Sequence, residues 1–294
     1  MNLLEINDKY MKNGFVVIRN FFDKDSLLKI EKSIKSHISF HLHKQGVAHI
    51  KDLENEGLIK LNDIRKDKSK FDSIQVIYNT IRKLPETYNL ISNPKLIEVV
   101  KKLSGITELD INGSPYIWEG FCRVDPPQDE TYDLRWHQES YFTLPNSNSV
   151  QLWAPIINNI TENETGTIMT IANSHKSGEI PHHIVRQNNN YISESILPEN
   201  LENFEEGGKF ELNVGDVLLF HENLIHRTIN NQGSKVRYTL IANYANPYLN
   251  NFKFMSEDQV VAYHKMRTAN AAEFADYIKT YTNKGGIKDF NLSS

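Results

Sequence analysis

The second half of the chain contains a series of short segments rich in β-branched and aromatic residues, with no amphipathic helix between them. After Gly105 the hydrophobic period becomes strand-like, in the segments PYIWEGFCRV, VQLWAPI, GTIMTIA, KFELNVGDVLLF and RYTLIANY. Each segment is bounded by Asn, Gly, Asp or Pro, residues that punctuate strands. Consecutive strands without crossover helices predict an antiparallel sandwich or barrel rather than a parallel βαβ sheet.

The first part of the chain combines one strand with helical patterns. The run GFVVI, residues 14–18, predicts a buried strand. A helix is expected next, with Asp23 or Asp25 as its N-cap. Its buried side would be formed by apolar residues that recur at helical spacing: Leu27, Ile30, Ile34 and Ile38.

A second helix is predicted by NPKLIEVVKKLSG, with Asn93 as N-cap, Pro94 in the first turn and Gly105 at its end. Between these two helices, residues 39–70 are polar and weakly periodic, so we expect a solvated surface loop or a lid there.

The tail predicts a further helix, because SEDQVVAYHKM begins with Ser256 and has Gln259 three residues later, as in a capping box. No internal repeat or low-complexity linker divides the chain. We therefore expect a fold that is mainly β with flanking helices. It would form a single domain over 1–294, with mainly helical support (1–110), a β core (111–250) and a C-terminal helix (251–294).

Composition excludes several classes of protein. The net charge of −4 gives no electrostatic reason to expect nucleic acid or an anionic membrane as partner. The single cysteine, Cys122, excludes an internal disulfide framework and a Cys-rich metal site, and is expected to be a small buried residue. The start of the chain lacks the basic and apolar pattern of a signal peptide, and no apolar run is long enough to span a bilayer. A cytoplasmic location is expected.

The stretch LRWHQES places two metal-ligating residue types close together. His137 and Glu139 are two residues apart, and a strand would point both to one face about 6–7 Å apart. Their tips would then converge on one ion. Such a triplet arises often by chance, so the prediction depends on a partner elsewhere in the chain.

A partner is available in GDVLLFHENLIHRTINNQGSKVRYTL, which contains His221, His226 and Arg237. Two histidines and one carboxylate on one face of an ion form the facial triad of non-heme Fe(II) oxygenases. An arginine matches a carboxylate through its planar fork, as a dicarboxylic cosubstrate would require. Spacing from the triplet leaves open which histidine completes the triad.

The sequence resembles the phytanoyl-CoA dioxygenase family of Fe(II)/2-oxoglutarate-dependent oxygenases, whose core is a double-stranded β-helix. The resemblance spans NGFVVIRNFFDKDSLLKI, WHQES, VQLWAPI, ETGTIMTIANSHKSG and GDVLLFHENLIHRTINNQGSKVRYTL, in the family's order. It implies metal ligands at His137, Glu139 and His226, since His226, unlike His221, is followed by an arginine at the family's spacing of eleven positions. It further implies cosubstrate contacts from Arg237 to the far carboxylate of 2-oxoglutarate, from Thr228 near that carboxylate, and from Trp153 in the pocket wall.

One residue departs from the family pattern: the usual acid is Asp, and this chain has Glu139. The extra methylene requires the backbone or rotamer to compensate. Because the acid is retained, the resemblance implies hydroxylation of a small molecule with Fe(II), 2-oxoglutarate and O₂, giving succinate and CO₂. The substrate itself is not readable. Three residues close in sequence to the triplet are candidates for holding it: Arg123, Arg135 and Tyr141.

Two other interpretations remain open. The fold would also suit a catalytically silent binding module in which Glu139 marks an impaired metal site, or a zinc hydrolase that needs neither Arg237 nor O₂. Among other residues of possible interest, His175 is expected to be structural or at the rim, and Trp118 and Trp136 to belong to the core. His182 and His183 are expected at the surface, within a mobile insertion over 180–208 that would also suit a lid.

Overall fold

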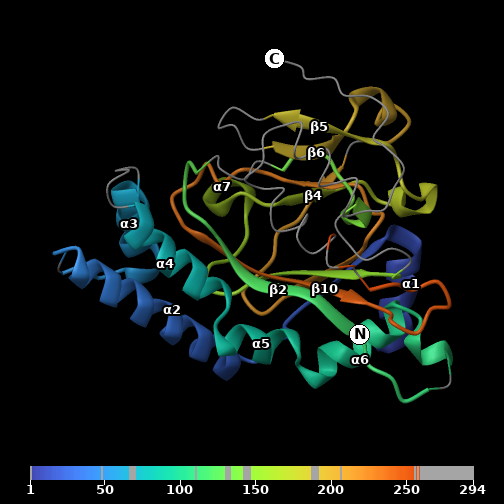
Figure 1. Ribbon diagram of the computed structural model, residues 1–294, viewed down its shortest axis with the longest axis horizontal. Coiled ribbons are helices and arrows are strands. Elements are labelled where there is room, and N and C mark those ends of the chain that lie inside the picture. The colour runs from blue at the N-terminus through green and yellow to red at the C-terminus, as the bar shows by residue number, and fades with distance from the viewer. Residues whose placement is uncertain are drawn as a thin grey trace.

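Two antiparallel sheets form the centre of the protein in the computed structural model (Figure 1). It describes residues 2–47, 49–65, 71–109, 111–129, 134–141, 147–186, 192–205, 207–254, 256 and 258. The larger sheet has the order β1-β8-β3-β10-β2. Its strands are β1 (Phe15–Ile18), β8 (Val217–His221), β3 (Val150–Pro155), β10 (Arg237–Ala245) and β2 (Tyr116–Asp125). All four strand pairs are antiparallel, which confirms the predicted sheet type.

The smaller sheet has the order β7-β4-β9, with β7 at Gly208–Lys209, β4 at Ile168–Thr170 and β9 at His226–Thr228. An isolated bridge between His137 and His226 adds the segment around residue 137 beside β9. A separate hairpin pairs β5 (His182–Arg186) with β6 (Ile192–Ile196).

Strand alternation divides the apolar side chains between two cores. On β3, Leu152 and Ala154 point to one face and belong to the core that the helices cover. Trp153 points to the other face and packs with Leu218 and Ile168, a residue of the smaller sheet. The second core therefore fills the space between the two sheets, and this interior is where the candidate site lies.

Helices from the first part of the chain cover the outer face of the larger sheet (Figure 1). They are α1 (Leu3–Asn13), α2 (Lys24–Lys44), α3 (Leu58–Arg65), α4 (Phe71–Arg82), α5 (Pro85–Ile91) and α6 (Pro94–Leu103). The first predicted helix is confirmed as α2, with Asp23 as N-cap and all four predicted apolar residues buried. The second is confirmed as α6, capped by Asn93.

The remaining elements are short and lie mainly in the connections. They are the π-helical turn η1 (Leu53–Gly57), the helix α7 (Glu162–Thr165) and the 3₁₀ turns η3 (Ile106–Leu109), η4 (Glu139–Tyr141), η5 (Ser174–Ser177) and η6 (Pro198–Asn200).

Two expectations about loops were wrong. Residues 39–70 are largely helical where the structure describes them, because α2 continues to Lys44 and α3 buries Leu58 and Leu61 completely. The insertion 180–208 contains the β5–β6 hairpin, and His182 is only 5% exposed instead of lying at the surface. The side chain of His183 and the predicted helix after Ser256 lie outside the described residues.

Two further differences concern single elements. Helix α1 was not predicted, although Asn2 and Glu5 form a complete capping box at its start. The segment KFELNVGDVLLF, residues 209–220, is not one strand: only Lys209 lies in β7 and only its last four residues lie in β8, and a turn closed by Asn213 and Asp216 lies between them.

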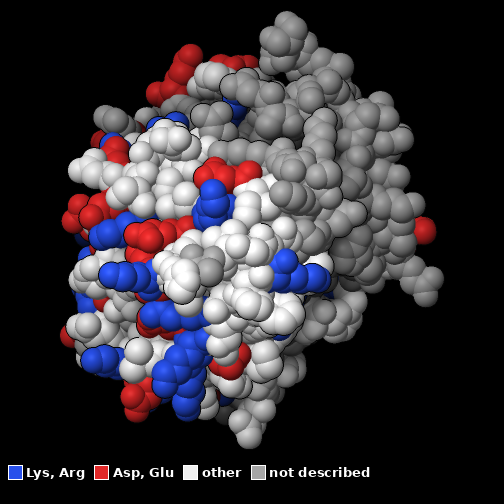
Figure 2. All heavy atoms as spheres, turned by 90° about the vertical axis from the view of Figure 1, so that its left-hand side faces the viewer, with Lys and Arg blue, Asp and Glu red and all other residues white. Residues whose placement is uncertain are grey.

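On the face shown in Figure 2, basic and acidic side chains are interspersed rather than gathered into areas of one sign. A mixed surface of this kind is typical of a solvated face. No helix within the described residues is long and apolar enough to cross a membrane.

Candidate functional site

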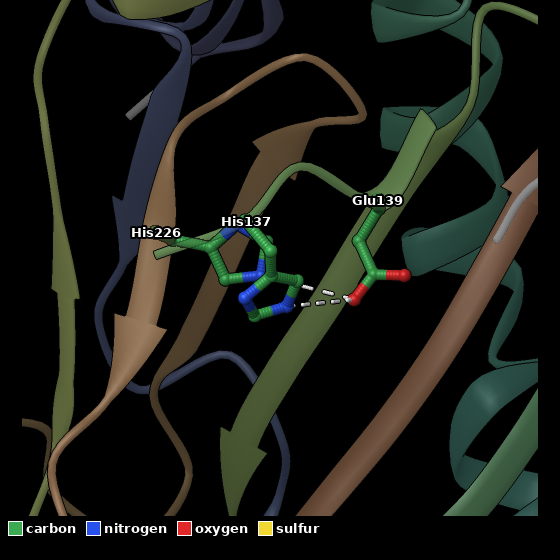
Figure 3. Close-up of side chains that lie close together, drawn as sticks. All are labelled: His137, Glu139 and His226. Atoms are coloured by element: carbon green, nitrogen blue, oxygen red, sulfur yellow. Dashed lines mark ion pairs between the residues drawn. The ribbon is translucent and has the colours of Figure 1, made fainter. Parts of the chain in front are cut away.

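Three side chains from two separate segments converge at one end of the space between the sheets (Figure 3). Glu139 Oε1 lies 3.8 Å from Nε2 of His137 and 3.7 Å from Nε2 of His226. One ligand atom from each residue lies within 4.8 Å of the others. The histidines are 3% and 5% exposed at the side chain and Glu139 is 22% exposed. This is the arrangement of two imidazoles and one carboxylate that a divalent metal would accept on one face.

The local structure differs from the strand geometry expected for the triplet. His137 pairs with His226 through two backbone hydrogen bonds, but Glu139 begins the 3₁₀ turn η4. At this turn the backbone leaves the direction of the strand. The side chain of Glu139 extends back toward both imidazoles. The longer side chain thus compensates for the turn, and Oε1 is almost equally distant from the two histidines.

The protonation states suit metal binding. Nδ1 of His137 lies 2.7 Å from the carbonyl of Arg135, and Nδ1 of His226 lies 2.9 Å from the carbonyl of Leu224. A carbonyl only accepts, so each Nδ1 carries a proton, which leaves Nε2 as the ring atom available to a metal. Burial, reinforced by His137, lowers the pKa of His226. Burial raises the pKa of Glu139, but the two imidazoles outweigh it and leave that pKa well below its ordinary value. An ionised carboxylate and imidazoles with an unprotonated Nε2 are the forms that bind a metal, so a bound metal would displace any proton held at Nε2.

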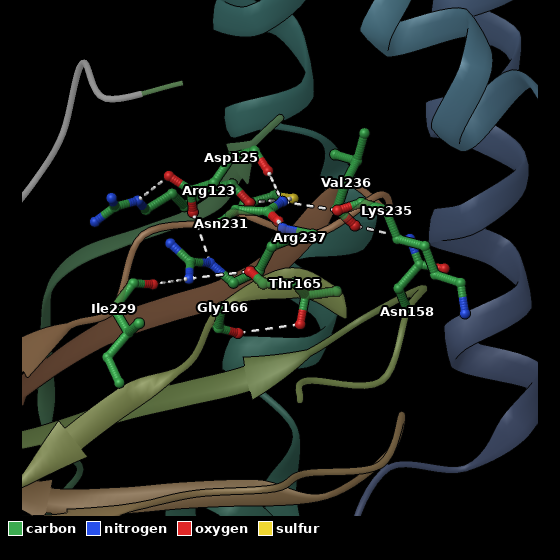
Figure 4. A network of polar contacts seen from close by, with 12 residues as sticks. Arg123, Asp125, Asn158, Thr165, Gly166, Ile229, Asn231, Lys235, Val236 and Arg237 are labelled. Atoms are coloured by element: carbon green, nitrogen blue, oxygen red, sulfur yellow. Dashed lines mark hydrogen bonds and ion pairs between the residues drawn. The ribbon is translucent and has the colours of Figure 1, made fainter. Parts of the chain in front are cut away.

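A second polar group lies deeper in the interior, around Arg237 at the start of β10 (Figure 4). The guanidinium is 2% exposed; Nε donates to Asp125 Oδ2 at 3.1 Å, and Nη1 donates to the carbonyls of Thr165 and Ile229 at 3.3 and 2.9 Å. Nη2 has no hydrogen bond to any described residue. The nearby hydroxyl of Thr228 is buried and has no partner either. Two unsatisfied donors beside a fixed cation fit a carboxylate.

A profile of the phytanoyl-CoA dioxygenase (PhyH) family matches residues 10–239. The chain belongs to the phytanoyl-CoA dioxygenase family. Members of this family use Fe(II), 2-oxoglutarate and O₂, and the chain is thereby placed among the Fe(II)/2-oxoglutarate-dependent oxygenases. A search of curated proteins finds no match.

Several solved structures of non-heme iron enzymes share the fold at low sequence identity. The non-heme monooxygenase ThoJ in its apo form aligns with a TM-score of 0.56 and 15% identity, over 83% of this chain and 78% of ThoJ. The epimerase SnoN, in complex with Fe³⁺, α-ketoglutarate and nogalamycin RO, gives 0.53 and 12%, over 83% of both chains. The carbocyclase SnoK from nogalamycin biosynthesis gives 0.52 and 14%, over 82% of this chain and 83% of SnoK. These likenesses confirm the predicted fold class, a mainly β core of the double-stranded β-helix type with flanking helices.

The other predicted contact residues of this family member occupy different places. Trp153 is 4% exposed and lies in the interior core between the sheets. Arg123 is held by Asp125, with 2.8 Å between Nε and Oδ1. Arg135 is exposed and lines a pocket of about 620 Å³ together with Trp136 and Arg227. None of the three metal-ligand candidates lines that pocket. Tyr141 ends η4, and its side chain lies outside the described part of the chain.

His221, the rival candidate for the third ligand, lies apart from the triad. Its Nδ1 accepts from the backbone N–H of Asn223 at 3.0 Å. Its ring packs 5.4 Å from that of His175 and 6.1 Å from that of Tyr10. Of the two histidines, the structure brings only His226 to His137 and Glu139.

The partly buried His221 predicts a pH-dependent loss of stability. Burial, and to a smaller extent His175, lower its pKa to about 4, against about 6.5 in an unfolded chain. The folded state therefore binds fewer protons, so the contribution is fully present above about pH 6.5 and is lost as pH falls toward about 4, by roughly 2–3 kcal/mol. Urea unfolding at pH 7.5 and pH 5 should show a smaller loss in His221→Asn, whose amide oxygen can still accept from Asn223. Equal losses in both proteins would contradict this assignment.

Two buried polar residues near the site were not singled out from the sequence. Gln138, between the metal-ligand candidates, is fully buried; its backbone N–H donates to His182 Nε2 at 3.0 Å, and its amide donates to the carbonyls of Gly178 and Asn223 at 2.9 and 2.6 Å. Asp125 holds both Arg123 and Arg237. The sequence offered one indication of the role of Asp125, because Arg123 and Asp125 are two residues apart at the end of a predicted strand. No sequence pattern indicated the role of Gln138.

Proposed function

We propose that this family member is an Fe(II)- and 2-oxoglutarate-dependent hydroxylase of a small-molecule substrate, with succinate and CO₂ as co-products. The observation that carries the proposal is the convergence of two imidazoles and one ionised carboxylate. Halogenating enzymes related to this family lack the acidic metal ligand, and halide binds in its place. Because this chain keeps an acid, Glu139, hydroxylation is favoured over halide transfer.

Different residues of the chain would bind the metal and the cosubstrate. His137, Glu139 and His226 would hold the metal, and Arg237 with Thr228 would hold the far carboxylate of 2-oxoglutarate. Bound iron supplies the oxidation of cosubstrate and substrate. Trp153, Leu218 and the other interior apolar residues exclude water from the space where the reaction takes place.

The test is anaerobic and begins without a substrate. Purified apo-protein is mixed with Fe(II) and 2-oxoglutarate, and the weak visible charge-transfer band of the chelated keto acid is measured. Air is then admitted and succinate is quantified. We expect both signals from the wild type. Thr228→Val, which removes only the unpartnered hydroxyl, should weaken 2-oxoglutarate binding by about 5- to 10-fold at an unchanged limiting band.

Two comparisons separate this proposal from its rivals. If only Glu139→Asp shows the band, the native site is impaired and the chain is a binding module. If the protein binds Zn(II) and hydrolyses esters or amides without regard to O₂ and 2-oxoglutarate, the oxygenase proposal fails.

A further inference from the structure

Two carboxamide side chains lie opposite each other on the inner face of the larger sheet. Gln151 of β3 and Asn243 of β10 are direct partners in the strand register. Their neighbours Leu152, Ala242 and Tyr244 all belong to the core beneath the helices. Strand alternation therefore turns Gln151 and Asn243 toward the interior, where the candidate metal ligands lie.

Both amides are buried and incompletely bonded. Gln151 is 2% exposed and Asn243 is 6% exposed. One end of the Gln151 amide bonds to the hydroxyl of Ser149, with 2.9 Å between Nε2 and Oγ, while Oε1 is buried without a partner. The amide of Asn243 makes no hydrogen bond within the part of the chain that the structure describes. Buried amides without partners are costly, so their retention indicates a group that satisfies them when it binds.

The register places this amide pair beside the metal candidates and away from Arg237. Gln151 is also the register partner of Phe220, whose ring lies 4.8 Å from that of His226. Arg237 lies on the same face of β10 as Asn243 but six residues earlier, roughly 20 Å along the strand. A five-carbon diacid that extends from Arg237 toward the metal ligands is too short to span this whole separation. The pair therefore lies beyond the cosubstrate's anchor, where the other reactant can bind.

We infer that Gln151 and Asn243 bind the primary substrate through an uncharged hydroxyl or amide group, and that the substrate is neutral at this point. This inference rests on the proposed function. Oε1 of Gln151 requires an O–H or N–H donor, and the Asn243 amide can both donate and accept. Neither brings a charge to pair with a phosphate or carboxylate. The two arginines predicted as substrate contacts lie elsewhere: Arg123 pairs with Asp125, and Arg135 lines the pocket that contains Trp136.

The test uses matched neutral and anionic probes on the iron-loaded enzyme. The pairs are glycerol with glycerol 3-phosphate, methyl glucoside with glucose 6-phosphate, and nicotinamide with nicotinate. Succinate formation above the probe-free rate reports productive binding. We expect stimulation by at least one neutral member and none by its anionic partner.

Near-isosteric variants then assign the effect to the two amides. For the stimulating probe, Gln151→Met and Asn243→Leu should each raise KM by about 5- to 100-fold. The KM for 2-oxoglutarate and the anaerobic band should not change. Thr228→Val is the matched control. It should raise the KM for 2-oxoglutarate and leave the KM for the probe unchanged.

Three results would overturn the inference: stimulation by anionic members alone, no stimulation by any neutral member, or variants that raise the KM for 2-oxoglutarate instead of that for the probe. Failure of the proposed function would look different, since the wild type would then show neither the anaerobic band nor probe-free succinate.

Discussion

Replacing His226 by alanine is expected to abolish tight Fe(II) binding and turnover. Its Nε2 faces the same point as Nε2 of His137 and the carboxylate of Glu139, and its Nδ1 is fixed by the carbonyl of Leu224. Loss of an outer partner of a metal ligand already costs 10- to 100-fold in affinity, so loss of the ligand itself should cost more than about 100-fold. Anaerobic equilibrium dialysis of Fe(II) measures the affinity, and succinate formation measures the turnover.

The matched control is His221→Asn, which changes a histidine five positions earlier that packs against His175 and Tyr10 instead. It should bind Fe(II) like the wild type. Because His226 is only 4% exposed, His226→Gln is tested as well, since it fills more of the buried volume. Near-wild-type iron binding in both His226 variants, combined with iron loss in His221→Asn, would reassign the third ligand to His221.

The sequence was a good guide to those parts of the fold that local pattern controls. Alternating apolar residues located the strands of the larger sheet, and helical spacing with clear caps located α2 and α6. Residues 39–70 were misjudged because the end of α2 buries only His41 and Leu42 there and most of its other positions are polar. A polar stretch with one narrow apolar stripe is difficult to distinguish from a loop by composition.

For the candidate site, spacing predicted which residues meet but not how they meet. The resemblance brought together His137, Glu139 and His226, and these three do converge. The 3₁₀ turn at Glu139 depends on the tertiary pairing of His137 with His226, which no local pattern encodes. The interior position of His182 likewise depends on the N–H of Gln138, 44 residues away in the sequence.

The ion pair between Asp125 and Arg237 is another feature that only the fold reveals, because the two residues are 112 positions apart. Asp125→Asn is expected to destabilise the protein by about 3–5 kcal/mol, since it leaves the buried Arg237 and the partly buried Arg123 without the carboxylate that they share. Asp125 is 7% exposed and lies 2.8 Å from Nε of Arg123 and 3.1 Å from Nε of Arg237. Burial raises the pKa of Asp125, but the two guanidinium groups lower it by more. The net pKa is below the ordinary value, so the carboxyl is ionised. Urea unfolding at pH 7.5 measures the loss.

Glu164→Gln is the matched control, because it breaks the ion pair with Lys235, two residues before Arg237. That pair is 44% and 48% exposed, and solvent screening limits its contribution to less than about 1 kcal/mol. Equal effects of the two substitutions would show that burial does not strengthen the pairing of Asp125.

The same substitution should also affect the cosubstrate. Nε of Arg237 is fixed by Asp125 and Nη1 by two carbonyls, so only Nη2 remains to meet a carboxylate beside Thr228. Without Asp125 the guanidinium loses one of its restraints, and the KM for 2-oxoglutarate should rise about tenfold or more, because small displacements of a positioning group are costly. The double variant Asp125→Asn with Arg123→Gln removes one of the two cations that Asp125 holds. It should recover part of the stability but not the KM, because the restraint on Arg237 stays absent. If stability and KM recovered together, Asp125 would act only by balancing charge, and its role in orienting Arg237 would have to be abandoned.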